Sequence, residues 1–298
     1  MNASVKLIEL VLPATVALQA DVPEEHASAR FLGTERHGSG VVVDPAGIIL
    51  TANYIVMGAR TVDVTLIDDT TVPARIVAHD YASGIAVLDM GAKVLGALRP
   101  GRSTELQLGQ EVFIVAAAGG NRRRANDGVV TSLGPYDAYW EYSLERAVTT
   151  SAMNPGVGGA ALLDMLGRVV GIVSLDLGEV GHFTLVIPAE VYTDHRDELL
   201  RLGRVARAPR AWVGIYCYSF GEHVVIAGLL PGTPGEQAGL KAGDVVVAVN
   251  DHPIRSRREL YTALWSRPAG ELIHFSVYRE NAVRQVAVTS GDAEEFFA

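Results

Sequence analysis

Short apolar runs separated by turn residues dominate the first two thirds of the chain. Residues 40–43 form one such run, the turn residues 44–47 follow it, and a second apolar run returns at 48–51, at hairpin distance. A further run at 169–173 is typical of a buried strand. Many short strands broken by Gly, Asp and Asn predict a mainly β domain, a barrel or a sandwich, over residues 1–190.

The pattern changes near residue 190. Apolar side chains such as Val191 and Leu199 recur at three- and four-residue spacing between charged residues. This spacing predicts an amphipathic helix over residues 189–204, which Gly203 ends. Residues 191–210 therefore form a helix and a linker.

A second domain follows the linker. Ser256 precedes Glu259 by three residues, which predicts a capping box at the start of a helix. Apolar residues then alternate along 273–277, and the pair 280–281 supplies a turn before the next strand. The pattern predicts a small α+β module. The predicted divisions of the chain are 1–190, 191–210, 211–292 and a tail, 293–298.

Composition narrows the function classes. The formal net charge of −9 argues against nucleic acid or an anionic membrane as the main partner, since neither attracts an acidic surface. No run of 18 apolar residues predicts a membrane span, and the single Cys217 cannot form an internal disulfide. Glu9 interrupts the apolar stretch 7–20, so we expect a cytoplasmic protein, or an extracytoplasmic one if a signal segment was removed.

Several motifs, in order along nearly the whole chain, resemble HtrA (DegP-like) serine proteases that carry a C-terminal PDZ domain. The motifs of the protease part lie at 38–51, 85–88, 154–159 and 167–172, and those of the PDZ part lie at 231–234, 238–246 and 249–254. The resemblance implies a mainly β fold, a chymotrypsin/trypsin-like double β-barrel followed by a small α+β PDZ domain. It also implies assembly as a homo-oligomer, for which a trimer is the family's usual form.

The three positions that match the family's catalytic residues carry other side chains. Tyr54 stands where the resemblance puts the histidine, Gly84 where it puts the aspartate, and Gly158 where it puts the serine. A serine nucleophile needs an imidazole base, and the imidazole needs an orienting carboxylate. A phenol with a pKa of about 10 is a poor base, and glycine has no side chain to react. We therefore expect no catalytic residue and no enzyme activity.

A shifted alignment does not supply the missing groups. The sequence has no histidine between His37 and His79, and no serine between Ser151 and Ser174. A relocated nucleophile stays an alternative, with His79 and its neighbour Asp80 as the nearest imidazole and carboxylate. Its candidate hydroxyls are those of Ser83, Thr149, Thr150 and Ser151.

The glycine-rich loop at 154–159 could keep its conformation even without the catalytic residues. In the active family, the N–H groups that match those of Gly156 and Gly158 stabilise an oxyanion, so a vestigial hole could still hold a carboxylate or a carbonyl. The alternative is that this loop only packs, because a fold can persist without its function.

The resemblance to PDZ domains predicts that the chain binds peptides. Such domains bind an extended peptide as an added strand. The resemblance puts the carboxylate-binding loop at Trp212, Val213, Gly214 and Ile215, and the groove between the strand 215–218 and the helix 256–266. Leu260 and Leu264 are candidates to line the apolar pocket, although at least one of them is expected to face only the core.

Three functions remain open at this stage. The first is a pseudoprotease that acts as an adaptor or regulator, binding protein C-termini or unfolded segments and partnering an active relative. The second is an unconventional serine or threonine hydrolase, and the third is a structural or metal-binding scaffold. The eight histidines lack metal-ligand spacing, so we expect no metal and no cofactor.

Overall fold

The structure is a computed structural model that describes residues 3–93, 96–177 and 182–298. It divides into two compact units, residues 1–135 with 145–206, and residues 136–144 with 207–298. Residues 136–144 belong to the second unit, where Glu141 is hydrogen-bonded to Gly214 and Ala138 to Tyr261. The predicted domain of residues 1–190 stays a prediction.

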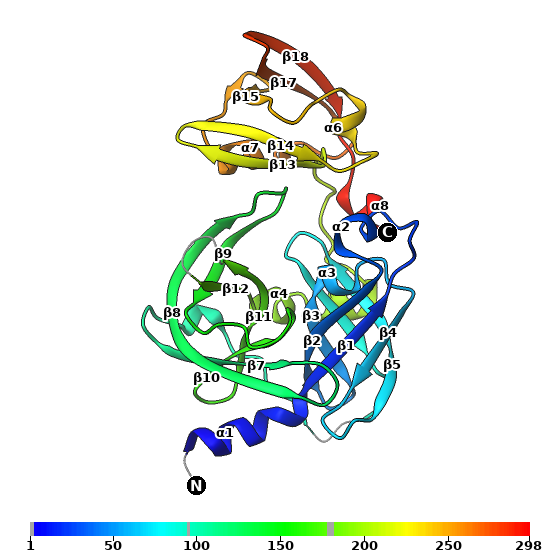
Figure 1. The fold of residues 1–298 in the computed structure, drawn as a ribbon, viewed down its shortest axis with the longest axis vertical. Coiled ribbons are helices and arrows are strands. Elements are labelled where there is room, and N and C mark those ends of the chain that lie inside the picture. Colours follow the sequence, from blue (N-terminus) through cyan, green and yellow to red (C-terminus); the bar gives the residue numbers. More distant parts are fainter. Residues whose placement is uncertain (1–2, 94–95, 178–181) are drawn as a thin grey trace. The chain divides into compact units, whose positions relative to one another are not determined.

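The first unit contains two closed β-barrels (Figure 1). The first barrel has the strand order β1-β2-β3-β6-β5-β4 and the second has the order β10-β11-β12-β9-β8-β7. The strands of the first barrel are β1 (Thr15–Asp21), β2 (Glu35–Asp44), β3 (Ile48–Ala52), β4 (Thr61–Thr65), β5 (Thr71–Asp80) and β6 (Ile85–Asp89). Those of the second are β7 (Glu111–Ala117), β8 (Arg123–Asp137), β9 (Ser143–Thr150), β10 (Ala161–Asp164), β11 (Val169–Leu177) and β12 (Phe183–Pro188). This architecture confirms the mainly β prediction.

Short helical elements complete the first unit. They are α1 (Ala3–Val11), η1 (Leu12–Ala14), α2 (Ala29–Leu32), α3 (Asn53–Val56), η2 (Ser103–Glu105), α4 (Glu190–Thr193) and α5 (Arg196–Leu202). The sequence predicted one helix over 189–204, and the structure has α4 and α5 there with a break at 194–195. Gly203 ends α5 in the left-handed conformation, φ 73°, as expected of a helix-ending glycine.

Burial explains why the barrels form. The inward residues of β3 and β6, such as Leu50 and Val87, are fully buried in one cluster that also contains Ile172 of the second barrel. A second cluster lies in the barrel of β7–β12 and includes the fully buried Ile114 and Leu162. Removing these side chains from water is the main driving force for closing the sheets.

The second unit has a sheet of strand order β13-β14-β15-β17-β18, with β16 paired to β15. Its elements are β13 (Ile215–Phe220), β14 (His223–Leu229), α6 (Pro234–Gln237), β15 (Val245–Val249), β16 (His252–Pro253), α7 (Arg257–Trp265), β17 (Leu272–Arg279), β18 (Ala282–Thr289) and α8 (Ala293–Phe296). The residues predicted as a tail include α8, whose Phe296 packs against the ring of Trp212 at 4.9 Å between centroids.

Candidate functional site

Tyr54 and Gly158 lie together in the first unit. Tyr54 belongs to α3, which begins directly after β3, and its hydroxyl donates a hydrogen bond to the carbonyl oxygen of Ser174 at 2.9 Å. A Cβ atom placed on Gly158 would be only 1.8 Å from that hydroxyl oxygen. Two motifs 104 positions apart in the printed sequence therefore meet at one place, and the tyrosine fills the space of any side chain at position 158.

The chemistry of Tyr54 is that of a hydrogen-bond donor. Burial, and then the charge of Asp176, raise the pKa of Tyr54 to about 12. The phenol is therefore protonated at neutral pH and cannot take a proton from a nucleophile.

Gly84 lies beside the start of α3. It ends a tight turn in which its N–H donates to the carbonyl oxygen of Asp80 at 2.8 Å, and its own carbonyl oxygen accepts from the N–H of Asn53 at 2.8 Å. Its φ of 81° is in the left-handed region that favours glycine. The structure thus brings all three positions of the expected triad to the neighbourhood of Asn53–Tyr54.

The loop at 154–159 is packed tightly against β2 and β7. The N–H of Ser39 donates to the carbonyl oxygen of Gly158 at 2.8 Å, and a Cβ on Gly159 would come within 2.2 Å of the carbonyl oxygen of Ser39. The N–H of Gly156 donates to the side-chain oxygen of Asn154 at 3.3 Å. Close packing of the loop against its neighbours is thus sufficient to account for these glycines. The vestigial oxyanion hole of Gly156 and Gly158 stays a prediction.

His79 and Asp80 have separate partners. The ring of His79 is hydrogen-bonded to the side chain of Asn53, and its pKa is lowered to about 4 by burial and then by His26. Asp80 accepts a hydrogen bond from the hydroxyl of Ser83 at 2.6 Å. The other candidate hydroxyls have structural bonds, Thr149 with Thr131, Thr150 with the carbonyl oxygen of Val129, and Ser151 with the N–H of Val129.

The second unit contains a carboxylate-binding loop. The consecutive N–H groups of Val213, Gly214 and Ile215 all donate to the side-chain carboxylate of Glu141, at 3.2, 2.6 and 3.0 Å to its Oε1. Gly214 has a φ of 81°, which allows the chain to turn its N–H groups toward one point. A Cβ on Gly214 would also lie 2.4 Å from the side chain of Thr233. Three of the four residues named for this loop thus form one cradle.

Trp212 has a different role from the one predicted. Its N–H and carbonyl groups pair with Gly291, at 3.0 and 2.8 Å, and its ring packs against Phe296 and Phe297. Its backbone is therefore paired with Gly291 in an isolated bridge, and the cradle begins one residue later, at Val213.

The side of the groove formed by α7 also differs in detail from the prediction. Leu260 and Leu264 are both completely buried in the core of the second unit. Tyr261 was not among the predicted groove residues, and its hydroxyl oxygen lies 2.9 Å from the carbonyl oxygen of Ala138 and 2.7 Å from that of Trp140. A single sequence gives no signal for this, because a tyrosine beside two leucines on a helix is typical of a core stripe.

The two units match two family models. Residues 38–172 match the trypsin-like peptidase domain, and residues 200–289 match the PDZ domain. The chain therefore has a trypsin-like fold followed by a PDZ fold. This combination confirms the fold class and the coarse HtrA/DegP-like resemblance.

Curated relatives of this two-domain chain bear one name. A protein of Marinomonas sp. (strain MWYL1) is 31% identical over 270 residues, 85% of this chain and 56% of its own length, and is named "Probable periplasmic serine endoprotease DegP-like". One of Pseudomonas savastanoi pv. phaseolicola is 29% identical over 276 residues, 87% of this chain and 56% of its own length, with the same name. The chain spans about half the length of these relatives.

Solved structures show the same fold. The "HtrA-type protease AlgW with tripeptide" is similar with a TM-score of 0.60 at 22% identity, covering 98% of this chain and 97% of that chain. The "serine endoprotease from Yersinia pestis" is similar with a TM-score of 0.58 at 23% identity, covering 98% of both chains. At this identity the likeness concerns the fold alone.

These names correct one expectation from the sequence. The peptidase-domain relatives are named serine endoproteases, which contradicts the prediction that this chain is not an enzyme. The prediction treated three positions as decisive for the whole chain, and the comparison shows it to be wrong. The relatives are also named periplasmic, so the expected cytoplasmic location has no support from them.

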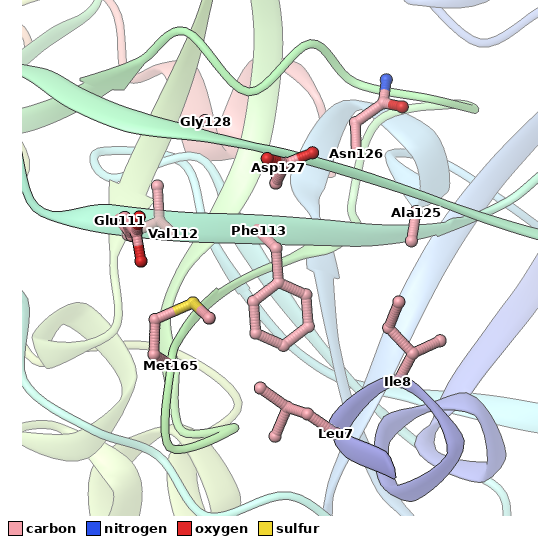
Figure 2. A pocket seen from close by; sticks show the side chains of 10 residues that line it. All are labelled: Leu7, Ile8, Glu111, Val112, Phe113, Ala125, Asn126, Asp127, Gly128 and Met165. Atoms are coloured by element: carbon pink, nitrogen blue, oxygen red, sulfur yellow. The ribbon is translucent and has the colours of Figure 1, made fainter. Parts of the chain in front are cut away.

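Three further observations concern the residues that the structure describes. No helix of the described residues is long and apolar enough to cross a membrane. Nor do three or more His, Cys, Asp or Glu side chains gather as metal ligands in the part of the chain that the structure describes. A hollow in the trypsin-like domain lies where Leu7 and Ile8 of α1 face Phe113 of β7, with Met165 beside them (Figure 2). It contains none of the predicted site residues.

Proposed function

We propose that this chain acts as a peptide-binding adaptor or regulator in DegP-like protein quality control, through the carboxylate cradle of its PDZ domain. One observation carries this proposal, the convergence of the N–H groups of Val213, Gly214 and Ile215 on a single carboxylate. Such a cradle recognises the end of a protein chain, while the adjacent strand β13 adds main-chain hydrogen bonds. The ligands are protein C-termini or unfolded segments.

The role of the cradle in peptide binding can be tested by removing the carboxylate of the peptide and by changing residue 214. Peptides with a free C-terminal carboxylate should bind the full chain, and the same peptides with an amidated C-terminus should bind at least about tenfold more weakly, because they lose charge-assisted hydrogen bonds. Gly214→Trp should abolish binding, since residue 214 has a φ of 81° and no room for a Cβ. Equal binding of free and amidated peptides would contradict the proposal.

Proteolysis is the second function, and the names of the relatives favour it. A serine-type reaction in this chain requires a hydroxyl from a position other than 158, since glycine stands there. Incubation with fluorescently labelled unfolded casein, beside an active HtrA protease, tests this function. If cleavage persists after repurification, a serine-reactive phosphonate and peptide mapping identify the hydroxyl, with Ser83 and Ser151 examined first.

Location and assembly complete the proposal. We place the chain in the periplasm, as the names of its relatives do for those proteins. The family resemblance supports a homo-oligomer, which sedimentation of the purified chain would measure. An active relative is the partner that co-purification would test.

A further inference from the structure

A segment of the chain itself lies in the peptide groove of the PDZ domain. Residues 136–144 comprise the end of β8, the connection 138–142 and the start of β9, and they belong to the second unit. The carbonyl oxygen of Tyr139 accepts a hydrogen bond from the N–H of Cys217 on β13, and Trp140 pairs with Tyr216 as an antiparallel bridge. The segment thus meets the edge strand β13 at an antiparallel bridge, where a peptide ligand adds its strand in a PDZ domain.

The segment also fills the cradle. The Glu141 side chain accepts hydrogen bonds from all three cradle N–H groups and is buried, with 9% of its surface exposed. A buried carboxylate is costly unless it is well paired, so these bonds hold it in one place. The glutamate side chain supplies the carboxylate that the last residue of a bound protein would otherwise supply.

Contacts from α7 fix the other end of the segment. The guanidinium of Arg258 binds the carboxylate of Asp137 through two nitrogens, Nε at 3.0 Å and Nη2 at 2.9 Å. The hydroxyl of Ser143 donates to the same carboxylate at 2.7 Å. With the Tyr261 hydroxyl on the carbonyl oxygens of Ala138 and Trp140, these bonds span the segment from Asp137 to Ser143.

Aromatic rings cover the segment on the side of β13. The ring of Tyr139 stacks on that of Tyr218 at 5.8 Å between centroids and lies 6.1 Å from that of Tyr216. Such contacts add to the main-chain bonds and distinguish this segment from an arbitrary one. The contacts are therefore those of a specific ligand.

We propose that residues Asp137–Ser143 are a built-in ligand of the PDZ domain, whose Glu141 side chain occupies the cradle and must leave before an external protein segment can bind. This inference rests on the proposed peptide-binding function. It also defines the external ligand, an acidic segment with a carboxylate for the cradle, aromatic residues for Tyr216 and Tyr218, and an acidic residue for Arg258. An external peptide can then bind only those molecules whose groove is open, so its apparent affinity is reduced in proportion to the fraction of such molecules.

The test uses a copy of the segment as the probe. The probe is a fluorescein-labelled peptide of residues 134–144 with blocked ends, so that the side chain of its glutamate is the cradle ligand, as it is in the protein. Its anisotropy is measured with the full chain and with Glu141→Ala. We expect the variant to bind the probe at least about tenfold more tightly than the unchanged chain, because the tethered segment competes at a high effective concentration. A probe with Ala at the position of Glu141, which has no acceptor oxygen for the cradle, should bind neither protein.

Hydrogen exchange provides a second readout that does not need the probe. The amides of Gly214 and Ile215 should be protected in the unchanged chain, exposed in Glu141→Ala, and protected again when the probe is added. Equal probe affinity of the two proteins, with the same protection, would overturn the built-in ligand while leaving peptide binding intact. If neither protein binds the probe or any peptide with a free C-terminus, both this inference and the proposed function fail.

Discussion

The hydroxyl oxygen of Tyr54 occupies the space beside the backbone of Gly158, 1.8 Å from where a Cβ atom would be. The phenol is held there by its bond to the carbonyl oxygen of Ser174. A side chain at position 158 and a tyrosine at position 54 in this rotamer are therefore incompatible. The two residues form a matched pair, although they come from different barrels.

The first prediction concerns this pair. Gly158→Ala should lower the free energy of unfolding by about 1–3 kcal/mol, because the added methyl group forces Tyr54 out of its position. In a Tyr54→Ala background the same substitution should cost much less. Urea unfolding of the four proteins gives the coupling energy directly.

A matched control is available at Gly134. A Cβ there meets no atom within 4 Å, and its φ is not in the left-handed region, so Gly134→Ala should change stability little in either background. Additive effects of the changes at positions 54 and 158 would show that the clash is relieved in another way.

The second prediction places a serine at position 158. In Tyr54→His/Gly158→Ser the smaller imidazole leaves room for the serine, and a serine-reactive phosphonate should label residue 158. Adding Gly84→Asp should increase the labelling rate, because a carboxylate orients the imidazole. Peptide mapping after labelling decides the outcome, with Gly158→Ser alone as the control. Absence of label at residue 158 in the triple variant would show that these positions do not form a working site.

Much of the fold followed from local pattern. The turn predicted at 44–47 has the N–H of Gly47 bonded to the carbonyl oxygen of Asp44 at 2.9 Å, and Gly47 has a φ of 100°. The first hydrogen bond of the predicted capping box is also present, from the N–H of Glu259 to the hydroxyl oxygen of Ser256 at 3.2 Å. Short-range hydrogen bonds of this kind depend on neighbours in sequence, so sequence alone can predict them.

The candidate sites were predictable only in part. The resemblance to PDZ domains placed the cradle at Trp212–Ile215, and in the structure the N–H groups of Val213, Gly214 and Ile215 converge on one carboxylate. No local pattern connects Glu141 with that loop, which lies more than 70 positions away. An acidic residue among aromatic ones is normally a solvent-exposed position, and only the tertiary fold shows that it is buried.

The third prediction concerns Arg258, which anchors the segment through Asp137. Arg258→Ala should increase hydrogen exchange in residues 137–142 about tenfold or more, because the two-nitrogen bond to Asp137 is lost. Arg258→Lys should restore little of the protection from exchange, since an ammonium group cannot make that paired contact. Mass spectrometry of the exchanged peptides measures this.

The control for this experiment is Arg284→Ala. Arg284 pairs with Glu280 at 3.5 Å on the surface of the same unit, and exposed ion pairs of this kind contribute little. Its removal should leave exchange in the segment unchanged. The same exchange rate in Arg258→Ala and Arg284→Ala would show that Arg258 does not hold the segment.

The last prediction is a pH dependence of the docked segment. Burial raises the pKa of Glu141 to about 7 against the opposing hydrogen bonds of the cradle and the charge of Arg210. The docked carboxyl therefore holds its proton more tightly than the free one, and docking is favoured fully only below the ordinary pKa of a glutamate. As pH rises through 7, that advantage is lost. Of the groups around it, Cys217 and Tyr261 have pKa values raised by burial, and they stay protonated in this range.

Protection of the Gly214 and Ile215 amides, corrected for the intrinsic exchange rate, should therefore fall between pH 5 and pH 8. The full shift of the Glu141 pKa corresponds to a change on the order of 100-fold in the docking equilibrium. Glu141→Gln removes the titrating group but keeps one acceptor oxygen for the cradle, so its protection should be nearly constant over the same range. Protection that rises with pH in the unchanged chain would mean that the cradle N–H groups and Arg210 outweigh burial, and that the docked glutamate is held as the carboxylate.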